Sequence, residues 1–199
     1  MTWIETVAPS EETPELNHAL QTVRGQLPIT YARRDLWEQP QAVLNDSIVL
    51  AHSLIPLAAE HALATWGALC QPDLPLSRRE QEIIATVVSA ANECFYCRES
   101  HTDFLRLETT DGDFARAVRD DWRTAPGLNE RELALCAYAE KLTKTPSRVV
   151  KKDLETLRAV GLDDTGILHA NLCASFFNYI NRVANGLGVG RDGEEGVHS

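Results

Sequence analysis

Through most of this chain the apolar residues recur every three or four positions, which is the spacing of an amphipathic helix. The clearest stripe consists of Ile83, Ile84, Val87, Val88 and Ala91. We find no pair of alternating β-branched segments joined by an Asn-Gly or Asp-Gly turn, so β-hairpins are not expected. The sequence therefore predicts an all-α fold.

Helix boundaries follow from capping residues and from proline. Ser77 with Glu80, and Asn129 with Glu132, have the spacing of capping boxes, which predicts a helix start at each pair. Pro56 should divide the apolar stretch 41–70 into two helices. Further helices are expected from about 93 or 94 to 107, around 117–118 after the segment TTDGDF, over 149–160 before Gly161, and over 163–187.

The two ends of the chain differ from its middle. Residues 1–40 contain Pro9, Pro14 and Pro28, which predicts an N-terminal arm with short helical pieces. Residues 41–189 are expected to form one helical domain. The last segment, 190–199, is rich in glycine and charge and is expected to be a disordered tail.

The charge distribution narrows the choice of partners. The net charge is −10 over 199 residues, and the lysines and arginines are scattered, so nucleic acid is not an expected partner. No apolar run is long enough to span a bilayer, and the N-terminus lacks the pattern of a secretory signal. We therefore expect no membrane partner and a cytoplasmic location.

The five cysteines fall into two groups. An odd number in a reducing compartment argues against a structural disulfide framework. Cys70, Cys136 and Cys173 lie among apolar residues and are expected to be buried as small hydrophobic side chains. Cys94 and Cys97 instead share the polar segment NECFYCRESHTDFL with a histidine.

This segment predicts a reactive thiol pair. If the helix begins near Cys94, then Cys94, Cys97 and His101 lie on one face, which Phe104 and Leu105 continue into the core. His101 lies one turn from Cys97, which makes Cys97 the expected nucleophile and Cys94 its partner. The first helical turn favours a thiolate at Cys94, and a disulfide between Cys94 and Cys97 should form and be easily reduced.

A nearby carboxylate would complete a proton relay. Glu82, in the preceding helix, could approach His101 or Cys97, although spacing alone leaves Glu80 and Glu93 as competitors. Cys94, Cys97 and His101 could also supply three zinc ligands, but no second CxxC or HxxxH follows, so no metal is expected.

Other polar residues are expected to be structural. We assign this role to His52, His61 and His169. On the last helix, Asn178, Tyr179, Asn181 and Arg182 form a polar patch, for which packing and oligomer contact are expected, with lining of the active-site mouth as the alternative.

The pattern Glu82-x11-Cys94-x2-Cys97-x3-His101 resembles the signature of the AhpD-like alkylhydroperoxidase family, within the carboxymuconolactone decarboxylase superfamily. The late segment FFNYINRVANGLGV is similar to the end of its peroxidase-related subgroup. The resemblance implies an AhpD-like helical bundle that forms homo-oligomers and reduces hydroperoxides without a metal or organic cofactor.

The resemblance also implies the role of each residue. Cys97 would attack the peroxide, Glu82 and His101 would relay protons, and Cys94 would resolve the sulfenic acid to a disulfide. An external dithiol of unknown identity would then reduce the pair. Some members carry a histidine where this chain has Tyr96, whose hydroxyl does not easily shuttle protons at neutral pH.

Two other functions remain open. A carboxymuconolactone-decarboxylase-type enzyme would need basic groups for a small dicarboxylate and no redox pair, so its activity should survive replacement of both cysteines. A non-enzymatic redox sensor would be oxidised stoichiometrically without turnover, and its oligomer size would change on oxidation.

Overall fold

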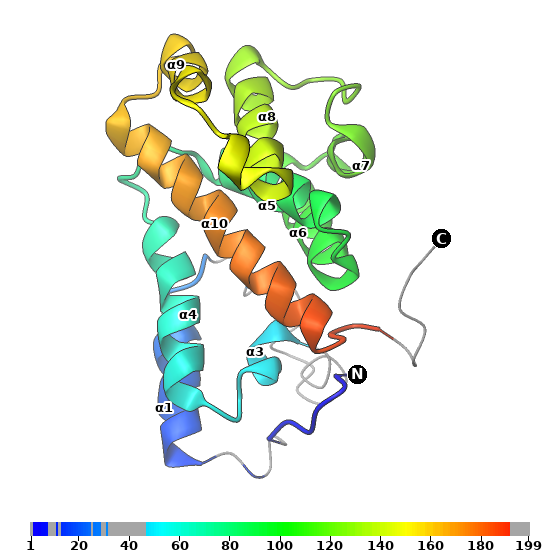
Figure 1. Cartoon of the computed structure of the whole chain (residues 1–199). Helices are drawn as coiled ribbons and strands as arrows, with labels where there is room; N and C mark the ends of the chain where they lie inside the picture. Colours follow the sequence, from blue (N-terminus) through cyan, green and yellow to red (C-terminus); the bar gives the residue numbers. More distant parts are fainter. Residues whose placement is uncertain are drawn as a thin grey trace. The chain divides into compact units, whose positions relative to one another are not determined.

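The computed structural model describes residues 2–7, 11, 13–24, 26–28, 31 and 47–191. Within these ranges the secondary structure consists of helices, with no strand, and the all-α prediction is confirmed (Figure 1). The chain divides into two units, Met1–Ala68 with Arg182–Ser199, and Leu69–Asn181. The proposed boundary between an arm and a domain at residues 40 and 41 lies outside the described residues, and so does the proposed tail 190–199 apart from its first two residues.

The second unit is built around α5 (Arg78–Ala91), which contacts α6 (Phe95–Thr109), α7 (Gly112–Asp121) and α8 (Glu130–Lys144). In the predicted apolar stripe of α5, Ile83, Ile84, Val87 and Val88 are buried, whereas Ala91 at the end of the helix is partly exposed. The unit continues through η3 (Pro146–Arg148) and α9 (Lys151–Ala159), and it ends within α10 (Asp164–Gly186). Gly161 ends the α9 region in a left-handed conformation, with φ of 87°, as its position in the sequence predicted.

Both predicted capping boxes are present. At the start of α5, the backbone N–H of Ser77 donates to Glu80 Oε2 over 2.8 Å, and the Ser77 hydroxyl accepts from the Glu80 N–H. At the start of α8, the N–H of Asn129 donates to Glu132 Oε2 over 3.0 Å, and Asn129 Oδ1 accepts in return. These contacts satisfy N–H groups that a helix start otherwise leaves unpaired.

Ion pairs between side chains also join the starts of α5 and α8. Arg131 of α8 donates to Glu80 Oε1 over 2.6 Å, and Arg79 of α5 donates to Glu132 Oε1 over 2.6 Å. Each of these glutamates therefore caps the N-terminus of its own helix and also binds an arginine of the other helix.

The first unit contains α1 (Pro14–Arg24), α3 (Ile48–Ala51) and α4 (Pro56–Leu69). The division at Pro56 is confirmed, because α4 begins at this residue. In this unit the Trp66 indole N–H donates to the Tyr31 hydroxyl over 2.9 Å. None of the helices in the described ranges is long and apolar enough to cross a bilayer.

Candidate active site

A tight turn between α5 and α6 places the cysteine pair. Glu93 has a left-handed backbone, with φ of 52°, and Cys94 is extended. The Cys94 N–H donates to the carbonyl oxygen of Ser89 over 3.0 Å, so it is used by α5 rather than by α6. The helix therefore begins at Phe95, and the prediction of a start at Glu93 or Cys94 was early by one or two residues.

This start places the two thiols at the N-cap and N3 positions of α6. Cys94 is the N-cap, and Cys97 is the third residue of the helix. In a capping box these are the two positions whose side chains reach back toward each other, as Ser77 and Glu80 do on α5. Both cysteines are free thiols, each 1% exposed, and a hydrogen bond links their side chains.

The Cys97 thiol holds its proton in this resting state. Its pKa is raised well above the ordinary value, first by the hydrogen bond with Cys94, then by burial and by the charge of Cys94, while a hydrogen bond from Asn181 acts in the opposite direction. Loss of both protons from two neighbouring thiols is unfavourable, because the two negative charges repel each other. Ionisation of Cys97 therefore requires a base, as the sequence analysis expected.

The structure brings one of the three candidate carboxylates to the histidine. Glu82 Oε2 lies 2.7 Å from His101 Nδ1, and both side chains are buried. Glu80 is instead held by Ser77 and Arg131 at the start of α5, and Glu93 is exposed in the turn. Glu82 is therefore the carboxylate that can act with His101.

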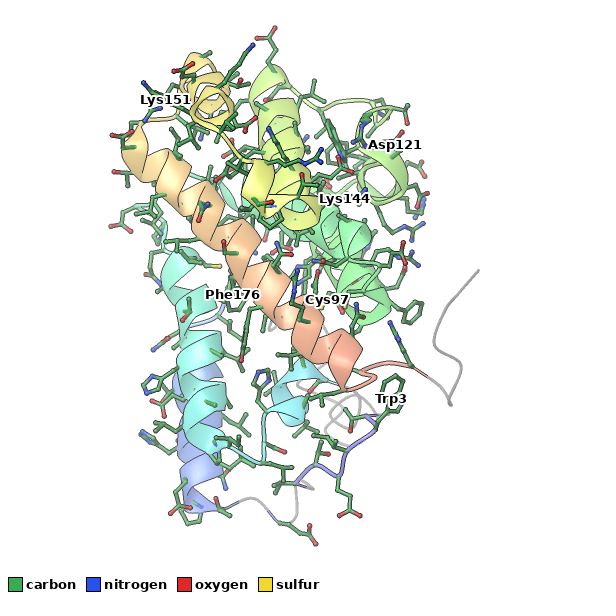
Figure 2. All side chains as sticks on the ribbon, in the orientation of Figure 1. Trp3, Cys97, Asp121, Lys144, Lys151 and Phe176 are labelled. Atoms are coloured by element: carbon green, nitrogen blue, oxygen red, sulfur yellow. The ribbon has the colours of Figure 1, made fainter. Side chains whose placement is uncertain are left out.

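Apolar rings hold the imidazole of His101 in place. The ring of Phe177 on α10 meets it edge-on with 4.4 Å between centroids, and Phe104 lies one turn further along α6 at 5.6 Å. Figure 2 shows Cys97 beside α10, the helix that carries Asn181. Cys97 and His101, four residues apart on one helix, share a face.

Asn181 belongs to the site, although the sequence favoured a packing role for it. Its amide accepts from Asn92 Nδ2 over 3.0 Å and donates to the Ser89 hydroxyl over 3.2 Å, and it forms a hydrogen bond with Cys97. The side chain is fully buried, whereas the neighbouring Tyr179 is 44% exposed. No spacing signal connects Asn181 with the cysteines, because only the tertiary fold brings α10 to them.

Arg78 is a second residue that the sequence analysis missed. Its Nη2 donates to Glu82 Oε1, the carboxylate oxygen that does not face His101. The available signal was the separation of four residues between Arg78 and Glu82, which places an arginine and a glutamate on the same face of a helix.

The remaining predicted residues lie elsewhere. His169 binds the carbonyl oxygen of Leu69 through Nε2 over 2.8 Å, and His52 binds the carbonyl oxygen of Ile48 through Nδ1 over 2.7 Å, which agrees with structural roles. Cys136 and Cys173 are fully buried. Among the residues that the structure describes, no group of three or more metal-ligating side chains could hold an ion.

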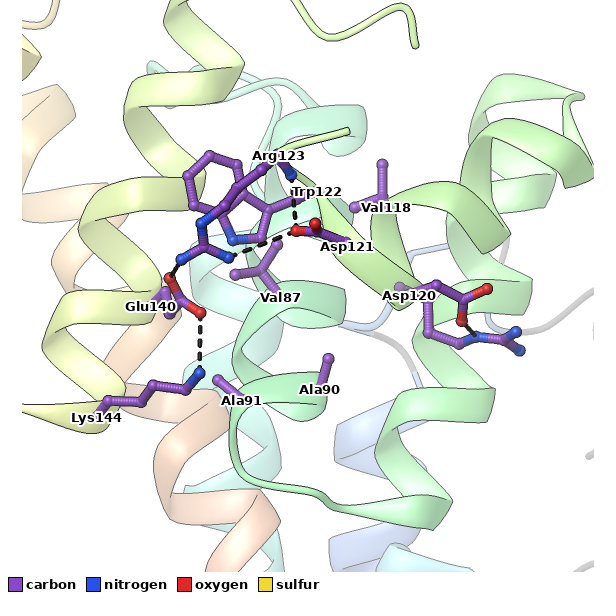
Figure 3. Close-up of a pocket in the computed structure, with 11 residues that line it drawn as sticks. Val87, Ala90, Ala91, Val118, Asp120, Asp121, Trp122, Arg123, Glu140 and Lys144 are labelled. Atoms are coloured by element: carbon purple, nitrogen blue, oxygen red, sulfur yellow. Dashed lines mark hydrogen bonds and ion pairs between the residues drawn. The ribbon is translucent and has the colours of Figure 1, made fainter. Parts of the chain in front are cut away.

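A surface pocket of about 370 Å³ lies on another part of the unit, between α5, α7 and α8 (Figure 3). Its floor includes Val87, Ala90 and Ala91, and its rim carries ion pairs from Glu140 to Arg123 and to Lys144. Neither cysteine lines it, nor do Glu82 and His101. The predicted site residues therefore lie outside this pocket.

The chain is similar to proteins of the family that its cysteine motif resembles. The profile of the carboxymuconolactone decarboxylase family matches residues 56–141. The structure is similar to an uncharacterised peroxidase-related protein from Silicibacter sp. TM1040, with a TM-score of 0.74, 25% identity, and coverage of 95% of this chain and 93% of that one. No curated protein matches the sequence.

Two further solved structures share the fold. One, described as an alkylhydroperoxidase AhpD core and an uncharacterised peroxidase-related protein from Ralstonia eutropha JMP134, has a TM-score of 0.75, 25% identity, and coverage of 97% and 93% of the two chains. The other is the debrominase Bmp8, with a TM-score of 0.71, 15% identity, and coverage of 96% and 91%. The family match and the two peroxidase-related structures support assignment of the chain to the AhpD-like proteins of the carboxymuconolactone decarboxylase superfamily.

Proposed function

We propose that this protein is a thiol-dependent peroxidase that reduces hydroperoxides through Cys94 and Cys97. The observation that carries the proposal is the 2.7 Å contact of Glu82 with His101, one helical turn from a hydrogen-bonded pair of thiols. A buried carboxylate against an imidazole is a common arrangement for moving a proton from a nucleophile.

The reaction would begin with proton transfer from Cys97 to His101. The thiolate attacks the peroxide, an S–O bond forms, the O–O bond breaks, and the departing alkoxide takes a proton to become an alcohol. Cys94 then attacks the sulfenic acid sulfur, so that a disulfide forms and water leaves. An external dithiol returns two electrons and two protons, which restores both thiols.

The raised pKa of Cys97 supports the need for this relay. A thiol whose pKa lies well above neutrality is a poor nucleophile until a base removes its proton. His101 lies one turn away on the same helix face, and Glu82 stabilises the imidazolium that forms. Tyr96 lies between the cysteines but offers a hydroxyl that is a weak acid, so we assign it no proton-transfer role.

The assembly of the protein is part of the same proposal. We propose that the protein forms a homo-oligomer. The support is a stripe on α10 where Leu168, Leu172 and Tyr179 are between 41% and 56% exposed at helical spacing. Large apolar side chains that gather on one exposed face are typical of protein–protein contacts.

The proposal depends on particular residues and not on the fold. Bmp8 is described as a debrominase, and a cysteine-to-alanine variant of it was solved with 2,3,4-tribromopyrrole, so proteins of this fold differ in their reactions. A decarboxylase or a redox sensor would leave different signatures in the cysteine variants of the present protein.

Trapping of the sulfenic acid tests the assigned roles. Cys94→Ser, treated with a hydroperoxide and dimedone, should acquire one adduct, and peptide mass analysis should find it on Cys97. Cys97→Ser should acquire none on Cys94, and Cys136→Ser, a buried cysteine outside the site, should behave as wild type. An adduct on Cys94 in Cys97→Ser, with none on Cys97 in Cys94→Ser, would show that the roles are reversed.

A further inference from the structure

We propose that Arg78 sets the tautomer of His101. By keeping Glu82 as a carboxylate, Arg78 holds the imidazole proton on Nδ1 and leaves Nε2 as the nitrogen that accepts the proton of Cys97. Arg78 is thus a positioning residue that acts through Glu82, and this role rests on the proposed peroxidase function.

The two oxygens of Glu82 have different partners. Oε1 accepts a hydrogen bond from Arg78 Nη2, and Oε2 lies 2.7 Å from His101 Nδ1. The Glu82 side chain is completely buried. A buried carboxylate stays ionised only when a cation and hydrogen bonds compensate for the lost water, and the guanidinium supplies both.

Arg78 is itself fixed by several groups. Its Nη1 donates to Gln81 Oε1, and the same nitrogen lies 3.1 Å from the sulfur of Cys70. Its Nε lies 3.9 Å from Glu108 Oε1. Gln81 is almost fully buried and donates in turn to the carbonyl oxygen of Leu69 over 3.0 Å. The guanidinium therefore has a defined orientation toward Glu82.

In the described part of the chain, three further titratable groups face Glu82 or Arg78, namely Cys70, Cys173 and Glu108, and none of them supplies a positive charge. Cys70 and Cys173 both interact electrostatically with Glu82, and burial raises the pKa of each thiol, to about 12 for Cys70. Both are therefore neutral near pH 7. Glu108 approaches Arg78 as a further carboxylate, so it adds negative charge.

Loss of the guanidinium should reverse the direction of the hydrogen bond. A buried Glu82 without its countercharge takes up a proton, and its O–H then donates to Nδ1. The imidazole proton moves to Nε2, which becomes a donor and cannot accept a proton from the thiol. Replacement of Arg78, which binds the Glu82 oxygen that does not face His101, would thus prevent His101 from acting as the base.

Side-chain NMR of 15N-labelled full-length protein near neutral pH tests this directly. In wild type we expect the His101 signals of a neutral ring with the proton on Nδ1, assigned by their loss in His101→Gln. Arg78→Gln should show the proton on Nε2. Arg78→Lys keeps a positive charge and should retain the wild-type tautomer. Arg79→Gln is the matched control, because Arg79 also pairs with a buried glutamate, Glu132, away from the site.

Kinetics give the second readout. If the base is lost, kcat/KM for hydroperoxide should fall by about a hundredfold in Arg78→Gln and stay within a few fold of wild type in Arg79→Gln. The wild-type tautomer in Arg78→Gln, or the reversed tautomer in Arg78→Lys, would overturn the proposal. The NMR result needs no peroxide, so it is independent of whether the peroxidase function itself fails.

Discussion

Cys97 is subject to two opposing influences at the residue scale. The hydrogen bond with Cys94 and burial raise its pKa, and the hydrogen bond from Asn181 lowers it. Asn181 is fully buried and fixed by Asn92 and Ser89, so its amide cannot turn away easily. The amide should therefore contribute to the stability of the thiolate that attacks the peroxide.

Replacement of this amide should make Cys97 harder to ionise. In a Cys94→Ser background, where Cys97 alone reports on the pair, Asn181→Leu should raise the pKa of Cys97. The rate of alkylation near neutral pH should fall by about tenfold, which corresponds to one pKa unit. Asn171→Leu is the control, because Asn171 lies on the same helix and donates to the Tyr138 hydroxyl over 2.7 Å. Equal alkylation rates in Asn181→Leu and Asn171→Leu would contradict the assignment of Asn181 to the site.

The residues of the site differ in how far the sequence could predict them. Cys94, Cys97 and His101 lie within one helical segment, so their spacing was informative. Spacing left three carboxylates as candidates, and the tertiary contact selected Glu82. Asn181 comes from α10, and no local pattern indicates which of the polar residues of that helix points inward.

At the scale of the elements, Glu80 links the start of α5 to the start of α8 through Arg131. Burial alone would raise the pKa of Glu80, but hydrogen bonds from Arg131 and from the Ser77 backbone and hydroxyl outweigh it, so the pKa is lowered. A carboxyl group with a lowered folded-state pKa stabilises the fold above its unfolded pKa, about 4.3. That contribution is lost as the pH falls through the lower folded-state pKa.

Glu80→Gln should therefore change the dependence of stability on pH. We expect the free energy of unfolding to fall by about 1 kcal/mol near neutral pH, because a cap and an ion pair are weakened. The loss of stability between about pH 5 and pH 3 should be less steep than in wild type. Urea denaturation over this range measures both, with Glu130→Gln, an exposed first-turn acid of α8, as the control. If the free energies of unfolding of Glu80→Gln and wild type changed with pH in parallel, Glu80 would not be the source of this pH dependence.

The helix boundaries show what local sequence can and cannot predict. Capping pairs and Pro56 predicted the starts of α5, α8 and α4 because these signals act through the neighbouring backbone. The start of α6 was misplaced because Glu93 adopts a left-handed conformation, which is unusual for a residue with a side chain. The displacement moves Cys94 to the N-cap, opposite Cys97.

At the scale of the whole molecule, the assigned site lies within the second unit. That unit holds α5, α6 and α8, while the first unit includes both ends of the chain. Within the first unit the Trp3 N–H donates to the carbonyl oxygen of Leu187 over 2.8 Å, and the Trp3 ring lies so close to Gly188 that a Cβ there would approach it to 2.3 Å. Helical periodicity predicted the fold class, but it carries no signal for such contacts between distant segments.

Hydroperoxide consumption by the intact protein with an excess of dithiol tests the central claim most directly. We predict catalytic turnover, and after one equivalent of hydroperoxide without dithiol, peptide mapping should find a disulfide between Cys94 and Cys97. Persistence of the peroxide, while both thiols still titrate as free, would contradict the proposed function. Formation of the disulfide without turnover would also contradict it and would favour a redox sensor.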